Sequence, residues 1–426
     1  MVEQLLGNAR HAFETSPPVG DPAYVRYCQV LSSLLTQEWA SVLQANAHDL
    51  KDAERRGLPS VLVERLRMGE SQLRHLVALT GKVARELPAA TASTQWVNVD
   101  EWGTLRRVPK PLGVVFMVYE ARPTVTVEGA LIPVVVGNAV LLRGGKEMAA
   151  TDAALADIVH RALLEAGLPA SMVTIVSDPD RSVLRELLKR HDAIDVLIPR
   201  GSPSLIEHCR SVSSIPVIAS GGGVNHIYVH HSADLKLAAA IALDSKLAEP
   251  TACNTVELML VDAQVADAFV EQLIKAGTAA EGPITLRLGA ALKAHDRANV
   301  SVQALGEHDL GREFLDATLG VLPVSGLDEA LAHIRRYGSK HTEGIIGNEA
   351  SVIDRFVALI DAAAVVINGS LRLHDGPTLE LGSEISISTG RLHVRGSVTL
   401  TALLTYSWVV DAKGALRADR STSCPF

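Results

Sequence analysis

Short apolar runs alternate with helix-like segments between residues 111 and 223, and this alternation restricts the fold more than any other feature. The runs cover residues 113–119, 139–143, 173–176, 193–198 and 215–218. Continuous apolar runs are typical of strands that are buried on both faces of a parallel sheet. Each run except the last leads into a segment with helical spacing, which predicts βαβ units. We therefore expect an α/β fold with a parallel sheet, closed by the glycine-rich stretch 219–223.

A second α/β unit is predicted to begin near Asn225. Its expected strands lie at 226–230, 255–261 and 364–367, and its expected helices at 234–246, 265–276, 327–337 and 351–360. Residues 341–346 resemble a loop that leads into a strand. The stretch 281–322 is less regular. Residues 1–90 have the spacing of scaffold helices, predicted at 25–43, 60–68 and 71–84, with a further helix start at 45–50. A length of 426 residues is in keeping with two or three domains.

Residues 96–110 have a different pattern. Val97, Val99 and Trp102 alternate with polar residues, Gly103 is a turn residue, and residues 105–108 form the return strand. This pattern predicts a β-hairpin. No helical segment within the hairpin covers its strands, so we expect it to protrude and to pair with another subunit.

Charge and cysteine content exclude several classes of protein. The net charge of -8 argues against a nucleic-acid surface, which needs clustered lysine and arginine. The four cysteines, Cys28, Cys209, Cys253 and Cys424, are far apart and do not form a disulfide framework, so we expect reduced thiols in a cytoplasmic protein. The N-terminal segment has no basic region followed by a long apolar stretch, and no apolar run is long enough to span a bilayer.

Cys253 is the strongest candidate for chemistry. A lone cysteine is usually a small buried apolar residue. This one lies in a polar loop, after a helix-like run and before a strand-like run, in the second α/β unit. A thiolate in that position could attack a substrate next to a cofactor held by the first unit. Because a strand follows the loop, no helix N-terminus is available to lower the pKa of the thiol, and the activating group must come from elsewhere.

Several polar residues follow the predicted strands. Gly144-Gly145-Lys146 and Gly201-Ser202 are turns that could hold a phosphate, with Arg143 adding charge, although plain turns are an equally simple interpretation. Neither is a GxGxxG motif. Arg122 and Arg372 could bind a carboxylate or phosphate, or could be ordinary surface arginines.

Histidines 226, 230 and 231 suggest metal ligands at first sight. No carboxylate or cysteine lies near them in the sequence at ligand spacing, so we predict no metal site.

Several motifs, taken together, resemble the gamma-glutamyl phosphate reductase family. The motifs, in chain order, are Tyr119-Glu120-Ala121-Arg122-Pro123, the run from Gly137 to Glu147, Ile198-Pro199-Arg200-Gly201, His226-Ile227-Tyr228-Val229, Cys253-Asn254-Thr255-Val256-Glu257, Asp375-Gly376, Ser386-Ile387-Ser388-Thr389 and Leu392-His393-Val394-Arg395-Gly396. They extend over residues 110–410, and their combination is far more specific than any one of them. The resemblance implies the aldehyde dehydrogenase fold and the NADPH-dependent reduction of L-glutamyl 5-phosphate to glutamate 5-semialdehyde, a step of proline synthesis.

The resemblance also implies roles for single residues. Cys253 matches the catalytic cysteine, which would form a thioester, and Asn254 is expected to assist it. Arg143 and Lys146 match positions beside the adenosine ribose of NADP, Ser202 a pyrophosphate-side serine, and Glu313 a position near the nicotinamide ribose. Arg122, His341 and Arg372 are the expected substrate-binding residues. The stretch 219–223 contains no carboxylate, which suits a reductase because no base is there to activate water against the thioester.

Other positions depart from the family pattern. Thr124 replaces an asparagine, Asn225 a cysteine, and Glu249 stands where the family usually has basic and polar residues before the catalytic cysteine. Two alternatives therefore stay open. One is an enzyme of the same fold with a different acyl substrate, and the other is a non-catalytic relative that binds nucleotide or a partner protein.

We predict two Rossmann-like α/β domains with an additional oligomerisation region. Residues 1–92 and 111–225 would form the NADP-binding domain, residues 226–390 the catalytic domain, and residues 93–110 with 391–426 the elements that join subunits. We expect a homo-oligomer, either a dimer or a tetramer, which acts on a small molecule and is functionally coupled to a glutamate kinase. We expect no nucleic-acid or membrane partner.

Overall fold

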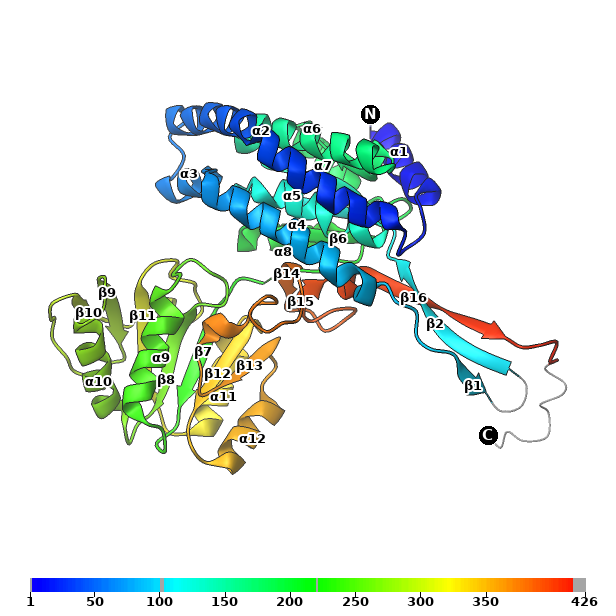
Figure 1. Ribbon diagram of the computed structural model, residues 1–426. Helices are drawn as coiled ribbons and strands as arrows, with labels where there is room; N and C mark the ends of the chain where they lie inside the picture. Colours follow the sequence, from blue (N-terminus) through cyan, green and yellow to red (C-terminus); the bar gives the residue numbers. More distant parts are fainter. Residues whose placement is uncertain (1, 100–102, 220, 417–426) are drawn as a thin grey trace.

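Figure 1 shows the computed structural model, which describes residues 2–99, 103–219 and 221–416. Helices and a four-stranded sheet form the upper part of the view, a seven-stranded sheet with its helices lies at lower left, and a long arm extends to the right. Trp102 of the predicted hairpin and Cys424 lie outside the described residues.

The four-stranded sheet confirms the predicted βαβ alternation. Its order is β5-β4-β3-β6, and all three pairings are parallel. The elements of this part are β3 (Val114–Tyr119), α5 (Thr124–Leu131), β4 (Ala139–Arg143), α6 (Ala149–Ala166), β5 (Val173–Ile175), α7 (Arg181–Leu187), β6 (Val196–Arg200) and α8 (Pro203–Val212). Side chains of β3 alternate between two cores, with Val115 and Met117 in one and Phe116 in the other. Burial on both faces explains why the strand sequence is continuously apolar.

Four N-terminal helices pack around this unit, with α2 against α6: α1 (Val2–Thr15), α2 (Pro22–Arg55), α3 (Ser60–Leu66) and α4 (Glu70–Ala90). The helix start predicted at 45–50 is wrong, because α2 is continuous through it. Asn46 and Asp49 have the side chains of a helix cap but serve tertiary contacts instead. Asn46 Nδ2 donates to the carbonyl of Leu66, and Asp49 accepts from the backbone N–H of Thr151. The side chains of Asn46 and Asp49, whose residue types suggested a helix start, therefore bond to other segments of the chain and do not cap a helix.

The second sheet has the order β10-β9-β11-β8-β7-β12-β13 and is parallel throughout. Its elements are β7 (Asn225–Val229), α9 (Leu235–Leu247), β8 (Val256–Asp262), α10 (Ala266–Thr278), β9 (Ile284–Leu288), β10 (Val300–Ala304), β11 (Thr318–Val324), α11 (Leu327–Tyr337), β12 (Thr342–Ile346), α12 (Ala350–Leu359) and β13 (Ala364–Ile367). The irregular stretch 281–322 therefore supplies three strands that the sequence pattern did not reveal. One core lies between the sheet and α9 and α10, and the other between the sheet and α11 and α12.

The predicted hairpin is confirmed and gains a third strand. The arm contains β1 (Val97–Val99), β2 (Gly103–Pro111) and β16 (Leu404–Asp411), and both pairings are antiparallel. Exposed apolar side chains on it include Tyr406, Trp408 and Val410. The pair β14 (Glu384–Ser388) and β15 (Gly396–Thr399) joins the core of the first sheet through Ile385 and Val398. Short 3₁₀ turns lie at Val134–Val136, Lys146–Met148, Ala170–Met172, Glu307–Asp309, Leu371–Leu373 and Thr401–Leu403.

The strand predicted at 215–218 is reduced to one bridge between Val217 and Leu197. Pro216 has no N–H to contribute to a ladder, which explains why pairing does not extend. None of the described helices is long and apolar enough to cross a membrane.

Candidate active site

Cys253 lies in a turn between α9 and β8, at the amino end of β8, and it is exposed. Hydrogen bonds within residues 249–255 fix this turn. The backbone N–H of Ala252 donates to the carbonyl of Glu249, and the hydroxyl of Thr255 donates to the same carbonyl at 2.7 Å. The other described cysteines, Cys28 and Cys209, are buried. Cys253 is therefore the described thiol that a substrate can reach.

Asn225, one of the departures from the family pattern, fixes the backbone of the Cys253 turn through side-chain hydrogen bonds. Its Nδ2 donates to the carbonyls of Cys253 at 2.8 Å and Thr255 at 2.7 Å, and its Oδ1 accepts from the N–H of Thr342. Gly223 approaches the same turn so closely that a Cβ there would overlap the carbonyl oxygen of Cys253. Any larger residue at Gly223 would displace the turn.

Two opposing influences act on the Cys253 thiol. Burial by the surrounding protein raises the pKa of the thiol above its ordinary value, even though solvent reaches the residue. The guanidinium groups of Arg200 and Arg122 oppose this shift, because a nearby cation favours the thiolate. Sequence reasoning did not identify Arg200 as a group that favours the thiolate.

Both arginines come from the carboxyl edge of the four-stranded sheet. Arg122 follows β3 and is exposed. Arg200 is the last residue of β6, where it pairs in register with Tyr119 of β3. In the sheet, β4 lies next to β3 on one side and β6 lies next to β3 on the other, so the strand order reverses direction at β3. Such a switch point at the carboxyl ends of parallel strands is where α/β sheets bind ligands. Arg200 Nη1 also donates to the carbonyl of Ile385.

The predicted cofactor residues follow neighbouring strands of this same edge. Arg143 Nη2 donates to the carbonyls of Asp178 and Asp180 at 3.3 and 3.2 Å, while its buried Nε has no hydrogen-bond partner among the described residues. Lys146 is exposed nearby in sequence. Ser202 is the N-cap of α8, whose first N–H groups and dipole favour an anion. Positive charge after β4 and a helix N-terminus after β6 are the groups that a dinucleotide with a ribose phosphate requires, so these residues fit such a cofactor.

Glu313 reaches the glycine-rich stretch beside the Cys253 turn. Its Oε1 accepts from the N–H of Gly223 at 2.6 Å. The next residue, Phe314, donates its N–H to Oε2 of Glu257 at 3.2 Å, and Lys246 Nζ donates to the same oxygen at 2.8 Å. Lys246 and Glu257 are both buried. Burial raises the pKa of Glu257 to about 7 and lowers the pKa of Lys246. This buried pair anchors the segment that carries Glu313.

Replacement of Lys246 by methionine should destabilise the protein, because it leaves the carboxyl group of Glu257 buried without its cation. Breaking a buried pair in this way costs about 3 kcal/mol or more. We expect a lower urea midpoint in equilibrium unfolding monitored by circular dichroism. The double variant K246M/E257Q should recover part of the loss, since it removes the unpaired acid. Equal midpoints for wild type and K246M would contradict the anchoring role.

Hydrogen bonds of His374 and Thr342 connect Asn254 to His341. Asn254 Nδ2 donates to the carbonyl of His374 at 3.0 Å, and Nδ1 of His374 lies 2.7 Å from the hydroxyl of Thr342. Nδ1 of His341 lies 2.7 Å from that hydroxyl as well. Burial, with a smaller effect of His374, lowers the pKa of His341 to about 3, so this imidazole is neutral. His341 is fully buried, and its role in binding substrate stays a prediction.

Arg372 pairs with Glu249 at 2.8 Å, and the side chain of Glu249 is 59% exposed. The unusual acid before the cysteine therefore has a cationic partner. Arg372 comes from the loop region after β13, and it reaches the Cys253 turn through this ion pair.

The structure thus connects most of the predicted residues. Arg122 acts on Cys253 electrostatically, Asn254 follows Cys253 in the same turn, and Arg372 reaches the turn through its ion pair with Glu249. Glu313 reaches the turn through Gly223, and Arg143, Lys146 and Ser202 lie on the edge that also carries Arg122. Sequence reasoning missed Arg200, Lys246 and Glu257 as functional candidates. Arg200 could have been found as the charged residue at the end of an otherwise apolar, buried strand.

Comparison with known proteins gives consistent results. A sequence model of the aldehyde dehydrogenase family matches residues 33–300. The gamma-glutamyl phosphate reductase of Symbiobacterium thermophilum is 39% identical over 435 aligned positions, which cover 98% of this chain and 99% of that protein. The crystal structure of gamma-glutamyl phosphate reductase from Thermotoga maritima superposes with a TM-score of 0.89 at 30% identity, covering 98% of this chain and 99% of that one. An engineered glycolyl-CoA reductase with bound NADP+ has a TM-score of 0.72 at 16% identity, with 97% of both chains covered, and shares the fold.

Proposed function

This chain belongs to the gamma-glutamyl phosphate reductase family and is an oxidoreductase with the aldehyde dehydrogenase fold, and from that premise we propose that it reduces L-glutamyl 5-phosphate to L-glutamate 5-semialdehyde with release of phosphate. The observation that carries the proposal is the pairing of an exposed cysteine with two arginines that favour its thiolate. A nucleophile and a cationic site for a leaving phosphate are the two groups that the reaction needs from the protein.

The sulfur of Cys253 carries the acyl group in this proposal. The thiolate attacks the acyl carbon, a C–S bond forms, and the C–O bond to phosphate breaks with its electron pair leaving on phosphate. A nicotinamide cofactor, when bound, would supply the hydride that reduces the resulting thioester. The C–S bond then breaks, the aldehyde leaves, and the sulfur returns to the thiolate. Because residues 219–223 contain no carboxylate, no base in that stretch activates water against the thioester.

Arg122 and Arg200 have two tasks in this scheme. Their charges favour the thiolate before attack, and they balance the negative charge of the acyl phosphate and of the phosphate that leaves. Arg122 is exposed and free to meet the substrate, whereas Arg200 is anchored on the carbonyl of Ile385. We therefore assign phosphate binding to Arg122 and thiolate stabilisation mainly to Arg200.

We further propose NADPH as the cofactor. Members of the aldehyde dehydrogenase family use nicotinamide cofactors, and Arg143 with Lys146 would hold the ribose phosphate that distinguishes NADPH from NADH. Ser202 and the N-terminus of α8 would hold the pyrophosphate. Glu313, fixed against Gly223, would hold the ribose next to the nicotinamide.

Replacement of Lys146 by alanine should raise the KM for NADPH about tenfold, because one charge-assisted contact with the ribose phosphate is lost. The KM for NADH should stay unchanged, since NADH has no such phosphate. Steady-state kinetics with both cofactors provide the measurement. The exposed Lys51, replaced by alanine, is the matched control. An equal rise in KM for both cofactors would contradict the assignment.

Glu249 motivated the alternative of a different acyl substrate. Its pairing with Arg372 supports the glutamyl substrate instead, because the ion pair neutralises the acid near a dianionic ligand. The two residues together add no net negative charge to the site. A panel of acyl phosphates or aldehydes separates the alternatives.

We propose that residues 1–92 and 111–225 hold the cofactor and that residues 226–390 hold the nucleophile. Residues 93–110 and 391–426, of which 100–102 and 417–426 lie outside the described part, would join subunits. The exposed Trp408 and Tyr406 on β16 offer an apolar face for a second copy. A kinase that forms the acyl phosphate would supply the substrate.

The reverse reaction tests the proposed function directly. With glutamate semialdehyde, phosphate and NADP+, we expect NADPH to form at a rate that depends on phosphate. Turnover with another aldehyde and none with glutamate semialdehyde would favour the alternative substrate. No turnover and no NADPH binding would favour a non-catalytic role.

A further inference from the structure

A second group of polar side chains lies at the carboxyl edge of the seven-stranded sheet, at the opposite end of β8 from Cys253. His230 and His231 follow β7, and Asp262 ends β8. Seven strand residues at about 3.3 Å each place roughly 20 Å between the two ends of β8. The group is therefore separate from the Cys253 site.

The topology makes this edge a natural binding position. Helices α9 and α10, which follow β7 and β8, pack in the core on one face of the sheet, and α11 and α12, which follow β11 and β12, pack on the other. Neighbouring strands β8 and β11 thus send their chains to opposite faces, as do β7 and β12. Crevices at such points outside the carboxyl ends of strands bind ligands in α/β proteins.

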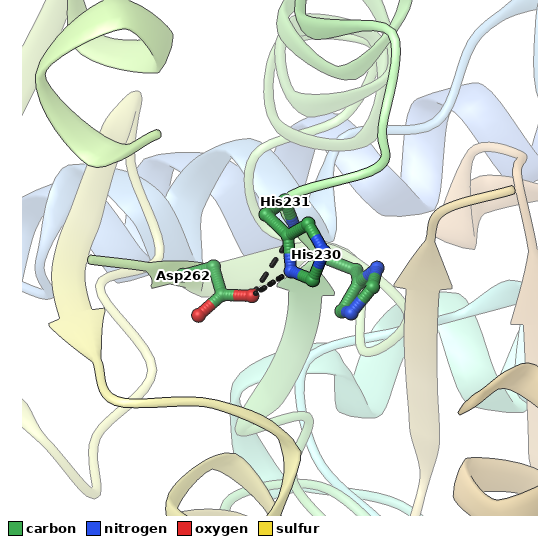
Figure 2. A group of neighbouring side chains, drawn as sticks. All are labelled: His230, His231 and Asp262. Carbon is green, nitrogen blue, oxygen red and sulfur yellow. Dashed lines mark hydrogen bonds and ion pairs between the residues drawn. The ribbon is translucent and has the colours of Figure 1, made fainter. Parts of the chain in front are cut away.

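The donor atoms of the group are close enough to share one ion. His230, His231 and Asp262 each offer one ligand atom, and these atoms all lie within 4.8 Å of one another. Figure 2 shows the two imidazoles and the carboxylate gathered at the strand ends, with Asp262 bonded to His231. His230 and Asp262 are buried, and the side chain of His231 is 41% exposed. No carboxylate lies near these histidines in the sequence at ligand spacing, but the fold brings Asp262 of β8 to 3.0 Å from Nδ1 of His231.

Hydrogen bonds around the group orient its donors. Nδ1 of His230 lies 2.8 Å from the hydroxyl of Ser232, which leaves Nε2 as the ligand atom of that ring. His231 lies between two carboxylates, with Nδ1 at 3.0 Å from Asp262 and Nε2 at 3.4 Å from Glu349. A neutral imidazole has one N–H and cannot donate to both. A metal ion bound to Nδ1 and Asp262, with the Nε2–H donating to Glu349, would give both ring nitrogens of His231 a partner. A carboxylate on the second ring nitrogen is the usual outer partner of a metal-bound histidine.

A cavity of about 400 Å³ adjoins the group. Its wall includes all three donor residues together with Gln264, Ser325, Ser351 and Arg355. Three protein ligands leave one position of a tetrahedral ion open. That position would face this cavity, whose wall includes both polar and apolar side chains, and water or a small anion would complete the coordination.

We propose that His230, His231 and Asp262 bind one divalent transition-metal ion, with Zn²⁺ the best match to two imidazoles and one carboxylate. The ion would tie the ends of β7 and β8 together and stabilise the sheet. It lies too far from Cys253 to touch the reacting atoms, so the proposal does not depend on the proposed function.

The test uses full-length protein without an affinity tag, stripped of metal with a chelator and then dialysed against Zn²⁺ with a competing chelator. A Cys253→Ser background removes metal binding by the exposed thiol. We expect one equivalent of Zn²⁺ and a higher melting temperature with the ion. His231→Ala should weaken binding by about 100-fold or more, and it removes an exposed ring, which limits damage to the fold. His208→Ala, at another exposed histidine, should leave binding unchanged.

Cobalt supplies the geometric readout. Co²⁺ in the Cys253→Ser protein should give visible bands typical of tetrahedral coordination without a sulfur ligand, and His231→Ala should remove them. The proposal is overturned if no stoichiometric Zn²⁺ binds, since the three side chains then form only a hydrogen-bonded cluster. It is equally overturned if His231→Ala binds Zn²⁺ as tightly as the parent protein does.

Discussion

Replacement of Cys253 by alanine is expected to lower turnover by about 10⁴-fold or more, because the acyl group then has no sulfur to carry it. The described part of the chain holds no other exposed thiol that could carry the acyl group. NADPH binding and the melting temperature should stay near the wild-type values, because the exposed side chain contributes little to the core. Steady-state assays in both directions, with NADPH binding by fluorescence, are the measurements.

Matched cysteine variants give the control. Burial raises the pKa of Cys28 to about 12 and of Cys209 to about 11, so both thiols are protonated and enclosed at neutral pH. Alanine at either position should leave the chemical step intact. Iodoacetamide should modify Cys253 far faster than Cys28 or Cys209, as read by peptide mass spectrometry, and the loss of activity should follow that modification. Retention of activity after complete alkylation of Cys253 would contradict the mechanism.

Replacement of Arg122 by glutamine should lower kcat/KM for the acyl phosphate by about 100-fold, equivalent to the loss of about 3 kcal/mol from a charged hydrogen-bonded contact. The KM for NADPH should change little, since Arg122 is assigned to the substrate. In the reverse direction the KM for phosphate should rise. Arg122 is exposed, so we expect the variant to fold normally.

The same variant should also change the pH dependence of alkylation. Arg122 lowers the pKa of the Cys253 thiol, and its removal therefore raises that pKa. At a fixed pH below the pKa, the thiolate fraction and the alkylation rate of R122Q should both be smaller than in wild type. Arg74→Gln, at an exposed arginine on α4, should match wild type in both assays. An unchanged KM for phosphate in R122Q would remove Arg122 from the substrate site.

The fold was predictable wherever burial alone determined the sequence pattern. Strand β3 is buried on both faces and is accordingly apolar throughout, and β8 is buried throughout with Glu257 and Asp262 as its only polar residues. The predicted family and the aldehyde dehydrogenase fold are confirmed by the comparisons. Strand β10 escaped prediction because Ser301, Gln303 and Ala304 are exposed at the edge of the sheet, where polar residues are tolerated.

The site was predictable only in part, because its electrostatics depend on contacts between distant segments. The polar residues of the Cys253 loop are visible in the sequence. The position of Arg200 relative to Cys253, in contrast, depends on β6, which belongs to the other sheet. The Glu249–Arg372 pair joins residues 123 positions apart, and Asp262 reaches His231 across 31 positions. No local spacing rule reports such pairs, so a single sequence could suggest the nucleophile but not its partners.

A single-turnover reaction tests the central claim, that the sulfur of Cys253 carries the acyl group. Enzyme is mixed with glutamate semialdehyde and NADP+ in the absence of phosphate, and NADPH is followed rapidly, with the intact mass of the protein measured afterwards. We expect a burst of one NADPH per active site and a glutamyl adduct on Cys253 that phosphate then releases. A burst of equal size in the Cys253→Ala protein, or an adduct on any other residue, would contradict the claim.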